Sequence, residues 1–435
     1  MVEPAAVFDL TVTLADMPTV LEVRWRTDVP ALATVIGRFA GGEVRVEEIE
    51  AVTDHAALLV GIPALTEVAV EVLPADGGEA GTATVVTGSL PSWVPDVTTE
   101  ADAPQAAEGG FTVVSAIGLL EGSGPVVFDG AGRPVWAVTR LLAGDSGVTR
   151  ARLSRDERAI VYLNMAPSAD GDAQIVRVPL DGGELLVTLV RGIHTDFVEL
   201  PSGGLAALGW DVRTYGDRTI VGDTIVELGP DGEARVVWSA YDTFAPDLDE
   251  DYPNWYPGDP LAEDWTHVNG IAYDADSDDY YVTMTWRSRV LRVDRGTGAV
   301  VWDLSDDGGS FARVGSRYLL DQPHSVQPTA TGVLVFNRED PIDPESCSGA
   351  TDITLNEAAF TAEATWVYTS EACLLTTFLG SAQRLPGGNT LVAFTNSGQL
   401  DEVTPAGELA WRVSAPIGTG FGFAERVPRL GDGFP

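Results

Sequence analysis

The sequence predicts an all-β protein in which a small β-sandwich domain is followed by a six-bladed β-propeller. Three observations lead to this prediction. The 435 residues include 47 Gly and 27 Pro, charged residues make up only 21% of the chain, and apolar runs are too short for a membrane span. Short segments alternate apolar and polar residues with a period of two. A pattern of turns and strands then recurs from residue 111 onward.

The first ninety or so residues are predicted to form a fibronectin-like or immunoglobulin-like sandwich. Leu21, Val23 and Trp25 share one face of a strand, and turn clusters such as 76–78 separate the strands. His55, next to Asp54, is predicted to lie at the surface. The following stretch is rich in Ala, Glu and Gly, which favours a linker. We therefore expect a β-sandwich domain over 1–98, a linker over 99–110 and a propeller over 111–435.

Two kinds of segment alternate through the rest of the chain. A turn, usually with glycine, leads into a strand that ends in an aromatic or branched residue, and a second recurrent segment follows each such strand. The first kind occupies 132–136, 183–187, 232–238, 298–302, 363–366 and 407–411, and the second 148–153, 194–200, 267–271, 324–327, 381–385 and 423–427. Repeats of this length made only of strands are typical of propeller blades, so six repeats predict six blades.

The order of segments also predicts how the ring closes. The last segment of the second kind, 423–427, has no outer strands after it, whereas 111–136 has outer strands with no inner strand before it. Both chain ends are therefore expected to share one blade, which removes the free edge of the ring.

Three of the four histidines, His194, His267 and His324, lie at the start of a segment of the second kind. Inner strands of a propeller line its central channel, so these three imidazoles are expected to meet at one mouth. Two functional interpretations stay open: a three-histidine metal site with an open position, or a covalent nucleophile with acid–base helpers. The structural alternative is that each histidine satisfies backbone groups at a turn.

Further residues are candidates for binding substrate at the same mouth. Asn269 lies two residues after His267, so both side chains point the same way on a strand. Arg287 shares a strand face with Arg289, and the alternative for either is a surface ion pair. The insertion 247–265 ends just before His267, and its aromatic residues are candidates for a lid over a flat substrate: Tyr252, Trp255 and Tyr256. Its acids are candidate calcium ligands, although they lack EF-hand spacing, and the plain alternative is an exposed acidic loop.

The charge of the chain excludes two classes of partner. There are 26 Lys and Arg against 65 Asp and Glu, a formal net charge of −39, and no basic cluster. Phosphate backbones and anionic lipid heads bind such clusters, so we expect neither nucleic-acid nor membrane-surface binding. The oligomeric state is left open.

Two cysteines, Cys347 and Cys373, are predicted to form a disulfide, the alternative being two buried thiols. The first residues show neither a basic segment nor an apolar run that would mark a leader. The predicted disulfide leads us to expect a secreted or periplasmic protein, and we expect its leader to be absent from this sequence.

Several of these segments together resemble the arylsulfotransferase family of bacterial aryl-sulfate sulfotransferases, over roughly residues 111 to 430. The segments that carry the resemblance are 194–197, 200–203, 264–269, 294–302, 322–327 and 380–392. The resemblance implies a nucleotide-independent transfer of a sulfuryl group from a phenolic sulfate ester to a phenol, without a cofactor and with small aromatic or sulfated partners. It implies that His324 forms a sulfohistidine intermediate. It also implies that His194, His267 and Asn269 hold the sulfuryl oxygens and exchange the phenolic proton.

The sequence departs from the family pattern at three positions. Ser325 stands where the family has Asp after the nucleophilic histidine, and Thr285 stands where it has Arg, so Arg287 is expected to substitute. Thr195 intervenes between His194 and Asp196. Two other functions remain as alternatives: a non-catalytic propeller that binds a sugar or aromatic ligand, and a three-histidine metalloenzyme at the same mouth.

Overall fold

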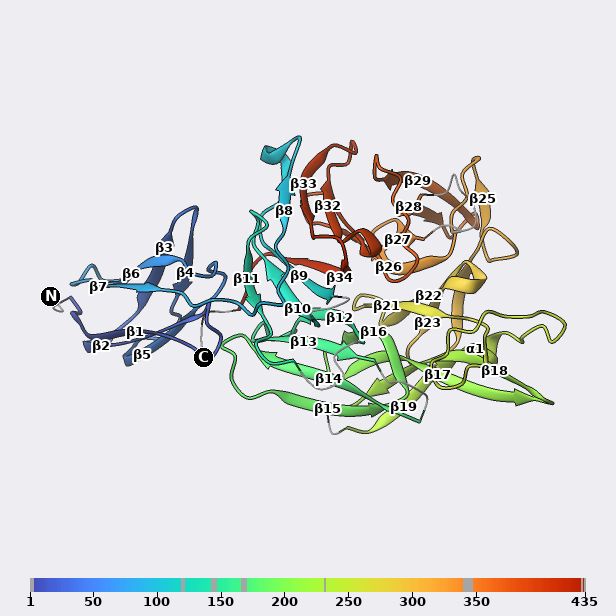
Figure 1. Ribbon diagram of the computed structural model, residues 1–435, viewed down its shortest axis with the longest axis horizontal. Coiled ribbons are helices and arrows are strands. Elements are labelled where there is room, and N and C mark those ends of the chain that lie inside the picture. The colour runs from blue at the N-terminus through green and yellow to red at the C-terminus, as the bar shows by residue number, and fades with distance from the viewer. Residues whose placement is uncertain are drawn as a thin grey trace.

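The computed structural model describes residues 4–118, 122–141, 147–165, 170–230, 232–338, 347–431 and 433. A ring of sheets lies beside a smaller N-terminal pair of sheets (Figure 1). In these ranges the helical segments are single turns: η1 (Pro104–Ala106), α1 (Ala240–Thr243), η2 (Thr285–Arg287) and η3 (Thr395–Ser397). None of the described helices has the length and apolar composition needed to cross a membrane. The predicted all-β class is confirmed.

Residues 7–86 form two antiparallel sheets. One contains β1 (Val7–Leu14), β2 (Leu21–Ala31) and β5 (Val52–Leu59), and the other β4 (Gly42–Glu47), β3 (Ala33–Phe39), β6 (Glu67–Pro74) and β7 (Gly81–Val86). Alternation along β2 buries Leu21, Val23 and Trp25 in one hydrophobic cluster with Val35 and Val70 from the other sheet. A period of two thus gives each sheet one apolar face, and the two faces share this core.

His55 is buried, although the sequence predicted it at the surface. It lies on the inward face of β5, and its ring stacks on Trp25 with the centroids 4.7 Å apart. Its Nδ1 is 2.8 Å from Glu48 Oε1 and its Nε2 is 2.9 Å from Thr27 Oγ1. Both ring nitrogens therefore have partners, which allows a polar ring to be buried. Neither partner is near it in sequence, so the pattern around Asp54 gave no sign of them.

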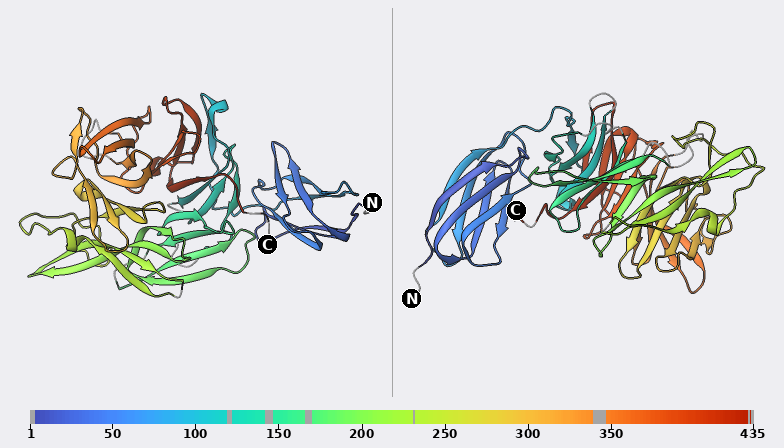
Figure 2. Two further views of the ribbon diagram at one scale, coloured as in Figure 1. Left: turned by 180° about the vertical axis from the view of Figure 1, so that it is seen from behind. Right: turned by 90° about the horizontal axis from the view of Figure 1, so that it is seen from below.

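In the described part of the chain the ring consists of six sheets, each built on four antiparallel strands. Figures 1 and 2 show how these sheets are arranged. From the inner strand outward they are β34 (Thr419–Val427), β9 (Phe111–Gly118), β10 (Ser123–Phe128) and β11 (Pro134–Ala137); β12 (Val148–Leu153), β13 (Ala159–Asn164), β14 (Asp172–Pro179) and β15 (Leu186–Arg191); β16 (Ile193–Glu199), β17 (Leu205–Tyr215), β18 (Arg218–Leu228) and β19 (Ala234–Ser239); β21 (Val268–Asp274), β22 (Asp279–Met284), β23 (Arg289–Asp294) and β24 (Val300–Leu304); β26 (Pro323–Thr329), β27 (Gly332–Asn337), β28 (Gly349–Asn356) and β29 (Thr361–Thr369); β30 (Ser381–Arg384), β31 (Thr390–Phe394), β32 (Gln399–Val403) and β33 (Leu409–Ser414).

Three short strands extend these sheets at their outer side: β8 (Thr98–Glu100) pairs with β33, β20 (Glu263–Asp264) with β18, and β25 (Ala312–Val314) with β29. Each inner strand contacts the inner strand of the next sheet, from β34 through β12, β16, β21, β26 and β30 back to β34. The C-terminal strand β34 pairs with β9, so one blade contains strands from both ends of the ring-forming chain.

Side chains on the inner strands join neighbouring blades by accepting backbone N–H groups. The pairs are Ile271 N to Asp196 Oδ2 (3.1 Å), Ala382 N to Ser325 Oγ (3.2 Å) and Ala424 N to Ser381 Oγ (3.0 Å). Each pair satisfies a buried N–H group that no strand of its own sheet can reach. Ser325, which stands where the related family has Asp, therefore has a structural role between two blades.

The segment 99–110, predicted as a linker, is packed against the ring. β8 extends the sheet of β33, and the Glu108 carboxylate accepts the backbone N–H groups of Gly387 (2.7 Å) and Asn389 (2.8 Å). The Glu108 backbone N–H donates to Glu402 Oε1 at 2.5 Å. The composition resembles that of a linker, but one carboxylate and a three-residue strand are enough to fix the segment.

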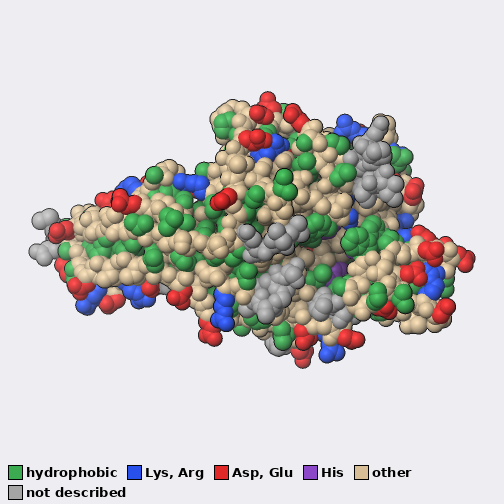
Figure 3. All heavy atoms as spheres, viewed as in Figure 1, with side chains coloured by type: hydrophobic (Ala, Val, Ile, Leu, Met, Phe, Trp, Pro, Cys, Tyr) green, Lys and Arg blue, Asp and Glu red, His purple; other side chains and the backbone are tan. Residues whose placement is uncertain are grey.

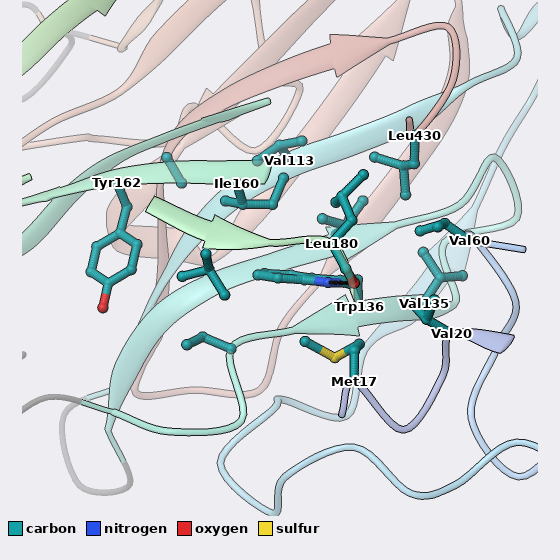
Figure 4. Packing of buried hydrophobic residues seen from close by; sticks show 14 of the residues in the cluster. Met17, Val20, Val60, Val113, Val135, Trp136, Ile160, Tyr162, Leu180 and Leu430 are labelled. Carbon is teal, nitrogen blue, oxygen red and sulfur yellow. Dashed lines mark hydrogen bonds between the residues drawn. The ribbon is translucent and has the colours of Figure 1, made fainter. Parts of the chain in front are cut away.

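The N-terminal sheets share a hydrophobic core with the first blades. Met17 and Val20 pack with Val135 and Trp136, as Figure 4 shows. The indole Nε1 of Trp136 donates to the Leu180 carbonyl at 3.0 Å. Burial of these apolar side chains favours one arrangement of the two parts.

Ring closure depends on a buried ion pair beside β34. Arg426 Nη1 lies 3.0 Å from Glu402 Oε2, and neither side chain is more than 4% exposed. The Arg426 Nε donates to Thr112 Oγ1 on β9 at 2.9 Å, and Nη1 donates to the Glu108 carbonyl at 2.5 Å. One guanidinium therefore links β34, β9 and the segment before it.

Replacing Arg426 with Met should destabilise the fold strongly. The change leaves the Glu402 carboxylate buried without its cation, which costs about 3 kcal/mol or more. Urea unfolding followed by circular dichroism measures the effect. The control is Arg429→Met, since Arg429 pairs with Glu157 at 2.7 Å but its side chain is 65% exposed. Equal losses of stability in the two variants would contradict the role of Arg426.

Candidate functional site

A cavity of about 260 Å³ lies at one end of the inner strands and contains the three predicted histidines. His194 belongs to β16, His267 immediately precedes β21, and His324 belongs to β26. Asn269, Thr195, Asp223, Asp264 and Arg338 also line it, with an apolar wall of Val148, Met165, Trp210, Trp255, Phe378 and Leu379. Figure 3 shows a histidine side chain inside a recess of the molecular surface.

β-Bulges at the cavity end of the inner strands direct these side chains inward. The register shifts between His194 and Phe197 in β16, between Val268 and Gly270 in β21, and between Pro323 and Ser325 in β26. Asn269 and His324 are therefore the extra residues of their strands. A bulge turns a side chain away from the regular alternation and is common beside functional sites. Thr195, which intervenes in the first histidine motif, lies within the bulge of β16.

His324 is held as a neutral imidazole. It is 2% exposed, and its Nδ1 has no hydrogen-bond partner among the described residues. Burial, the positive charge of Arg338 and the neighbouring His267 lower the pKa of His324 well below its usual range. A neutral ring keeps a nitrogen lone pair available, which is what a nucleophilic histidine needs.

His267 is oriented by a carboxylate and by aromatic rings. Its Nδ1 bonds to Asp264 Oδ2, and its backbone N–H donates to Asp264 Oδ1 at 3.1 Å. Its ring stacks on Trp286 with the centroids 4.8 Å apart. The backbone of His267 has a φ of 50°, which sets the ring at the start of β21. With Nδ1 bound to a carboxylate, Nε2 is left to exchange a proton with a ligand.

His194 is buried, as His324 is. It is 4% exposed and its ring stacks on Trp210 with the centroids 4.8 Å apart. Its Nδ1 lies 2.9 Å from Thr195 Oγ1, and its Nε2 lies 3.0 Å from Asp223 Oδ1 without the alignment of a hydrogen bond. Asp223 also accepts the Val268 N–H at 2.9 Å. This carboxylate therefore links His194 to the strand that follows His267.

Asn269 is fixed by Thr285, the first residue of η2. Its Nδ2 donates to Thr285 Oγ1 at 2.8 Å, and this hydroxyl donates to the Pro323 carbonyl at 2.8 Å. The chain of bonds runs from the Asn269 amide to the residue before His324. Thr285 thus fixes Asn269 relative to the backbone next to His324, and its own side chain is uncharged.

Comparison of the sequence with known protein families shows which family the chain belongs to. The family described as Arylsulfotransferase (ASST) matches residues 96–410, which is more than half of the chain. The chain belongs to the arylsulfotransferase family. No curated protein matches it.

Solved structures are similar only distantly. The periplasmic gluconolactonase of Pseudomonas aeruginosa is 17% identical, with 73% of this chain and 99% of that chain covered and a TM-score of 0.42. A putative 6-phosphogluconolactonase from Bacteroides fragilis is 13% identical, with 74% of this chain and 100% of that chain covered and a TM-score of 0.42.

In this arylsulfotransferase family member, Arg287 does not line the cavity. It pairs with Glu250, Nη2 to Oε1 at 3.2 Å, and its guanidinium lies 5.1 Å from the ring centre of Tyr252. Residues two apart on a strand point the same way, so the sequence led us to expect Arg287 to substitute for the arginine that the resemblance placed at the position of Thr285. Residues 285–287 instead form the turn η2, and Ser288 follows with a φ of 43°, so alternation does not apply there.

The insertion contributes one aromatic residue to the cavity. Trp255 lines it and is 56% exposed. Tyr252 is buried, and its hydroxyl donates to the Asp247 carbonyl at 2.9 Å. Tyr256 is also buried and packs edge-on against Trp210, 5.2 Å between centroids. Tyr252 and Tyr256 thus support the loop, and neither lines the cavity.

Arg338 lines the cavity and was not among the residues that the sequence suggested. It follows the last residue of β27 and is 5% exposed. A lone basic residue after the apolar run 333–336 was the available signal, but many surface arginines occur in the same context. The antiparallel pairing of β27 with β26, which sets Asn337 opposite Pro323, places Arg338 near His324.

The alternative of a metal centre lacks a ligand set. Within the described ranges, no three His, Cys, Asp or Glu side chains are arranged to hold a metal ion, and these ranges include the acidic loop 247–264. His267 and His194 each face a carboxylate through one ring nitrogen, an arrangement suited to proton exchange.

The predicted disulfide between Cys347 and Cys373 is confirmed. It joins the start of β28 to the loop that precedes β30, and Phe378 and Leu379 of that loop line the cavity.

The acid limb of the pH–rate profile for release of 4-nitrophenol from 4-nitrophenyl sulfate should lie below about pH 6.5, the ordinary pKa of histidine. The folded pKa of His324 is lowered, so the ring stays neutral as the pH falls through that value and is protonated only at lower pH. His194, His267, Asp223, Asp264 and Arg338 are the other titratable groups in the cavity. Single-turnover release of 4-nitrophenol from its sulfate is the measurement, because nitrophenolate leaves without needing a proton. An acid limb centred at or above about pH 6.5 would contradict the assignment.

Proposed function

We propose that the protein transfers a sulfuryl group from a phenolic sulfate ester to a phenol through a covalent intermediate on His324. The observation that carries the proposal is a buried, neutral His324 in one cavity with His267, His194 and Asn269. Membership of the arylsulfotransferase family supports this reaction class. The residues supply a nucleophile, a proton carrier and amide or imidazole donors in a space of small-molecule size.

In the first step, a nitrogen lone pair of His324 forms an N–S bond while the S–O bond to the phenol breaks. The departing phenolate takes a proton from the His267 imidazolium, whose charge Asp264 stabilises. In the second step, His267 removes a proton from the acceptor phenol, whose oxygen forms a new S–O bond as the N–S bond breaks. The enzyme returns to its starting state, because the sulfuryl group that His324 received and the proton that His267 donated have both been exchanged with the acceptor phenol.

Negative charge on the sulfuryl oxygens needs donors that are already in place. The Asn269 amide has one N–H bound to Thr285 and a second one left for a ligand. The His194 ring is fixed by Trp210, Thr195 and Asp223. Donors that do not reorganise stabilise the transition state more than donors that must move.

The mouth of the cavity suits an aromatic substrate. Trp255 and Phe378 line it and are 56% and 39% exposed. Exposed aromatic side chains bind flat rings without a large entropy cost. The disulfide supports an oxidising compartment, so we place the reaction in a secreted or periplasmic protein.

Incubation with 4-nitrophenyl sulfate and an acceptor phenol tests the proposal. The protein should release 4-nitrophenol and sulfate the acceptor, and His324→Ala should lower the rate by at least about 10³-fold because the nucleophile is removed. Without acceptor, the peptide that contains His324 should gain the mass of one SO₃ group. If the protein bound the sulfate ester without turning it over, the alternative of a non-catalytic binding protein would be favoured. If His324→Ala did not lower the turnover rate, the mechanism would be overturned.

Asp264→Asn should slow poor leaving groups more than good ones. The change removes the charge that stabilises the His267 imidazolium, so proton donation to the leaving phenolate weakens by about 10–100-fold. We expect this loss in kcat with 4-methoxyphenyl sulfate and a much smaller loss with 4-nitrophenyl sulfate. Asp276→Asn, an exposed change in the turn after β21, is the control. An equal loss with both substrates would point to a structural role for Asp264.

A further inference from the structure

The cavity contains a buried positive charge that has no carboxylate partner in the part of the chain that the structure describes. No Asp or Glu among the described residues lies within ion-pair distance of Arg338, which is 5% exposed. Burial lowers the pKa of Arg338 to about 10, so the guanidinium remains charged at neutral pH. An isolated buried charge is costly unless a ligand of opposite charge compensates it.

Other buried arginines of the ring have such partners. Arg426 pairs with Glu402 at 3.0 Å, and Arg150 lies 3.6 Å from Asp196. Arg338 differs from them in its surroundings. It faces His324, whose pKa it lowers, and it lines the cavity that holds the three histidines.

The guanidinium has donors left for a ligand. Its Nε donates to the Thr376 carbonyl at 3.3 Å, and its Nη2 donates to the Thr377 carbonyl. A guanidinium has five N–H groups, so three remain, including both on Nη1. A fork of this kind matches two oxygens of a tetrahedral anion.

Arg338 lies beside the turn η2. Its guanidinium is 5.8 Å from the ring centre of Trp286, the residue after Thr285. Thr285 itself is uncharged and bonds to Asn269 and Pro323. A positive charge therefore reaches this side of the cavity from the neighbouring blade.

The Cys347–Cys373 disulfide braces the loop that holds the guanidinium. Next to it, Ser348 N–H donates to the Leu374 carbonyl at 2.9 Å. The Ser348 hydroxyl donates to the Arg338 carbonyl at 2.7 Å and accepts the Thr376 N–H at 2.7 Å. These bonds fix the backbone of Arg338 and the carbonyl groups that its side chain contacts, as a preorganised site requires.

We propose that Arg338 binds the sulfuryl oxygens of the sulfate ester, and that the Cys347–Cys373 disulfide positions it. The proposal rests on the proposed function and deepens it, because it names the residue that recognises the anionic end of the substrate. Arg338 then neutralises the charge that spreads over the sulfuryl oxygens during transfer.

Binding in a protein that cannot turn over tests this assignment directly. Isothermal titration calorimetry of the His324→Ala protein with 4-nitrophenyl sulfate gives the reference affinity. Adding Arg338→Met should weaken binding by about 10–100-fold, since charge-assisted hydrogen bonds are lost. Arg338→Lys should keep part of the affinity, because it keeps the charge and loses the fork. Affinity for uncharged 4-nitrophenol, measured below its own pKa, should not change.

Two further results distinguish a failure of the Arg338 assignment from a failure of the proposed function. Equal affinity for the sulfate ester with and without Arg338→Met would overturn the role of Arg338, even if the enzyme transfers sulfuryl groups. Loss of sulfate-ester affinity in a protein that shows no transfer would keep the anion site and overturn the proposed function. Circular dichroism and thermal unfolding of each variant show whether the fold is kept.

The double variant Cys347→Ser and Cys373→Ser tests the positioning role. In the His324→Ala background it should weaken binding of 4-nitrophenyl sulfate several-fold and leave binding of 4-nitrophenol unchanged, if circular dichroism shows a folded ring. Combined with Arg338→Met it should add no further loss of sulfate-ester affinity, because both changes act through the same guanidinium. Additive losses, or unchanged affinity in the double variant, would overturn the positioning role.

Discussion

The pairing of β34 with β9 is the constraint on which the rest of the structure depends. Each blade buries its faces only against its neighbours, so the ring is stable only when the last inner strand joins the first part of the chain. Arg426 and Glu402 hold this junction from within. His194, His267 and His324 belong to three different blades, so the arrangement of the blades around the ring brings them together. Their common cavity is a consequence of ring closure.

At the cavity end of the inner strands, β-bulges interrupt the regular pairing and change the direction of the side chains. Bulges turn Asn269 and His324 inward, and His267 has a left-handed backbone. The irregular backbone is supported by buried polar partners such as Asp223, Asp264 and Thr285. Burial and the nearby positive charge of Arg338 lower the pKa of His324 and keep the ring neutral, while Arg338 keeps its own charge in the same cavity. A small anion thus finds a local positive charge inside a protein whose net charge is −39.

The sequence predicted the site best where residues follow the repeat. The three histidines stand at equivalent positions of the repeat, and equivalent positions meet around a ring, so their convergence was expected. Arg287 was misplaced because strand alternation was applied to a turn. Asn269 does line the cavity, but a bulge rather than alternation directs it there. Arg338 gave only a weak signal, since its role depends on contacts with Thr376, Thr377 and Trp286, all of them more than thirty residues away in the sequence.

By itself, the sequence determined the all-β class, the six repeats, the cysteine pair and the histidines that meet, because period-two alternation and repeat length are local properties of the chain. The tertiary structure alone decided which side chains face the cavity, which charges lack partners, and that 99–110 is packed rather than free. Those outcomes depend on bulges, left-handed residues and ion pairs whose partners lie far apart in sequence. Such contacts exist only once the ring has closed.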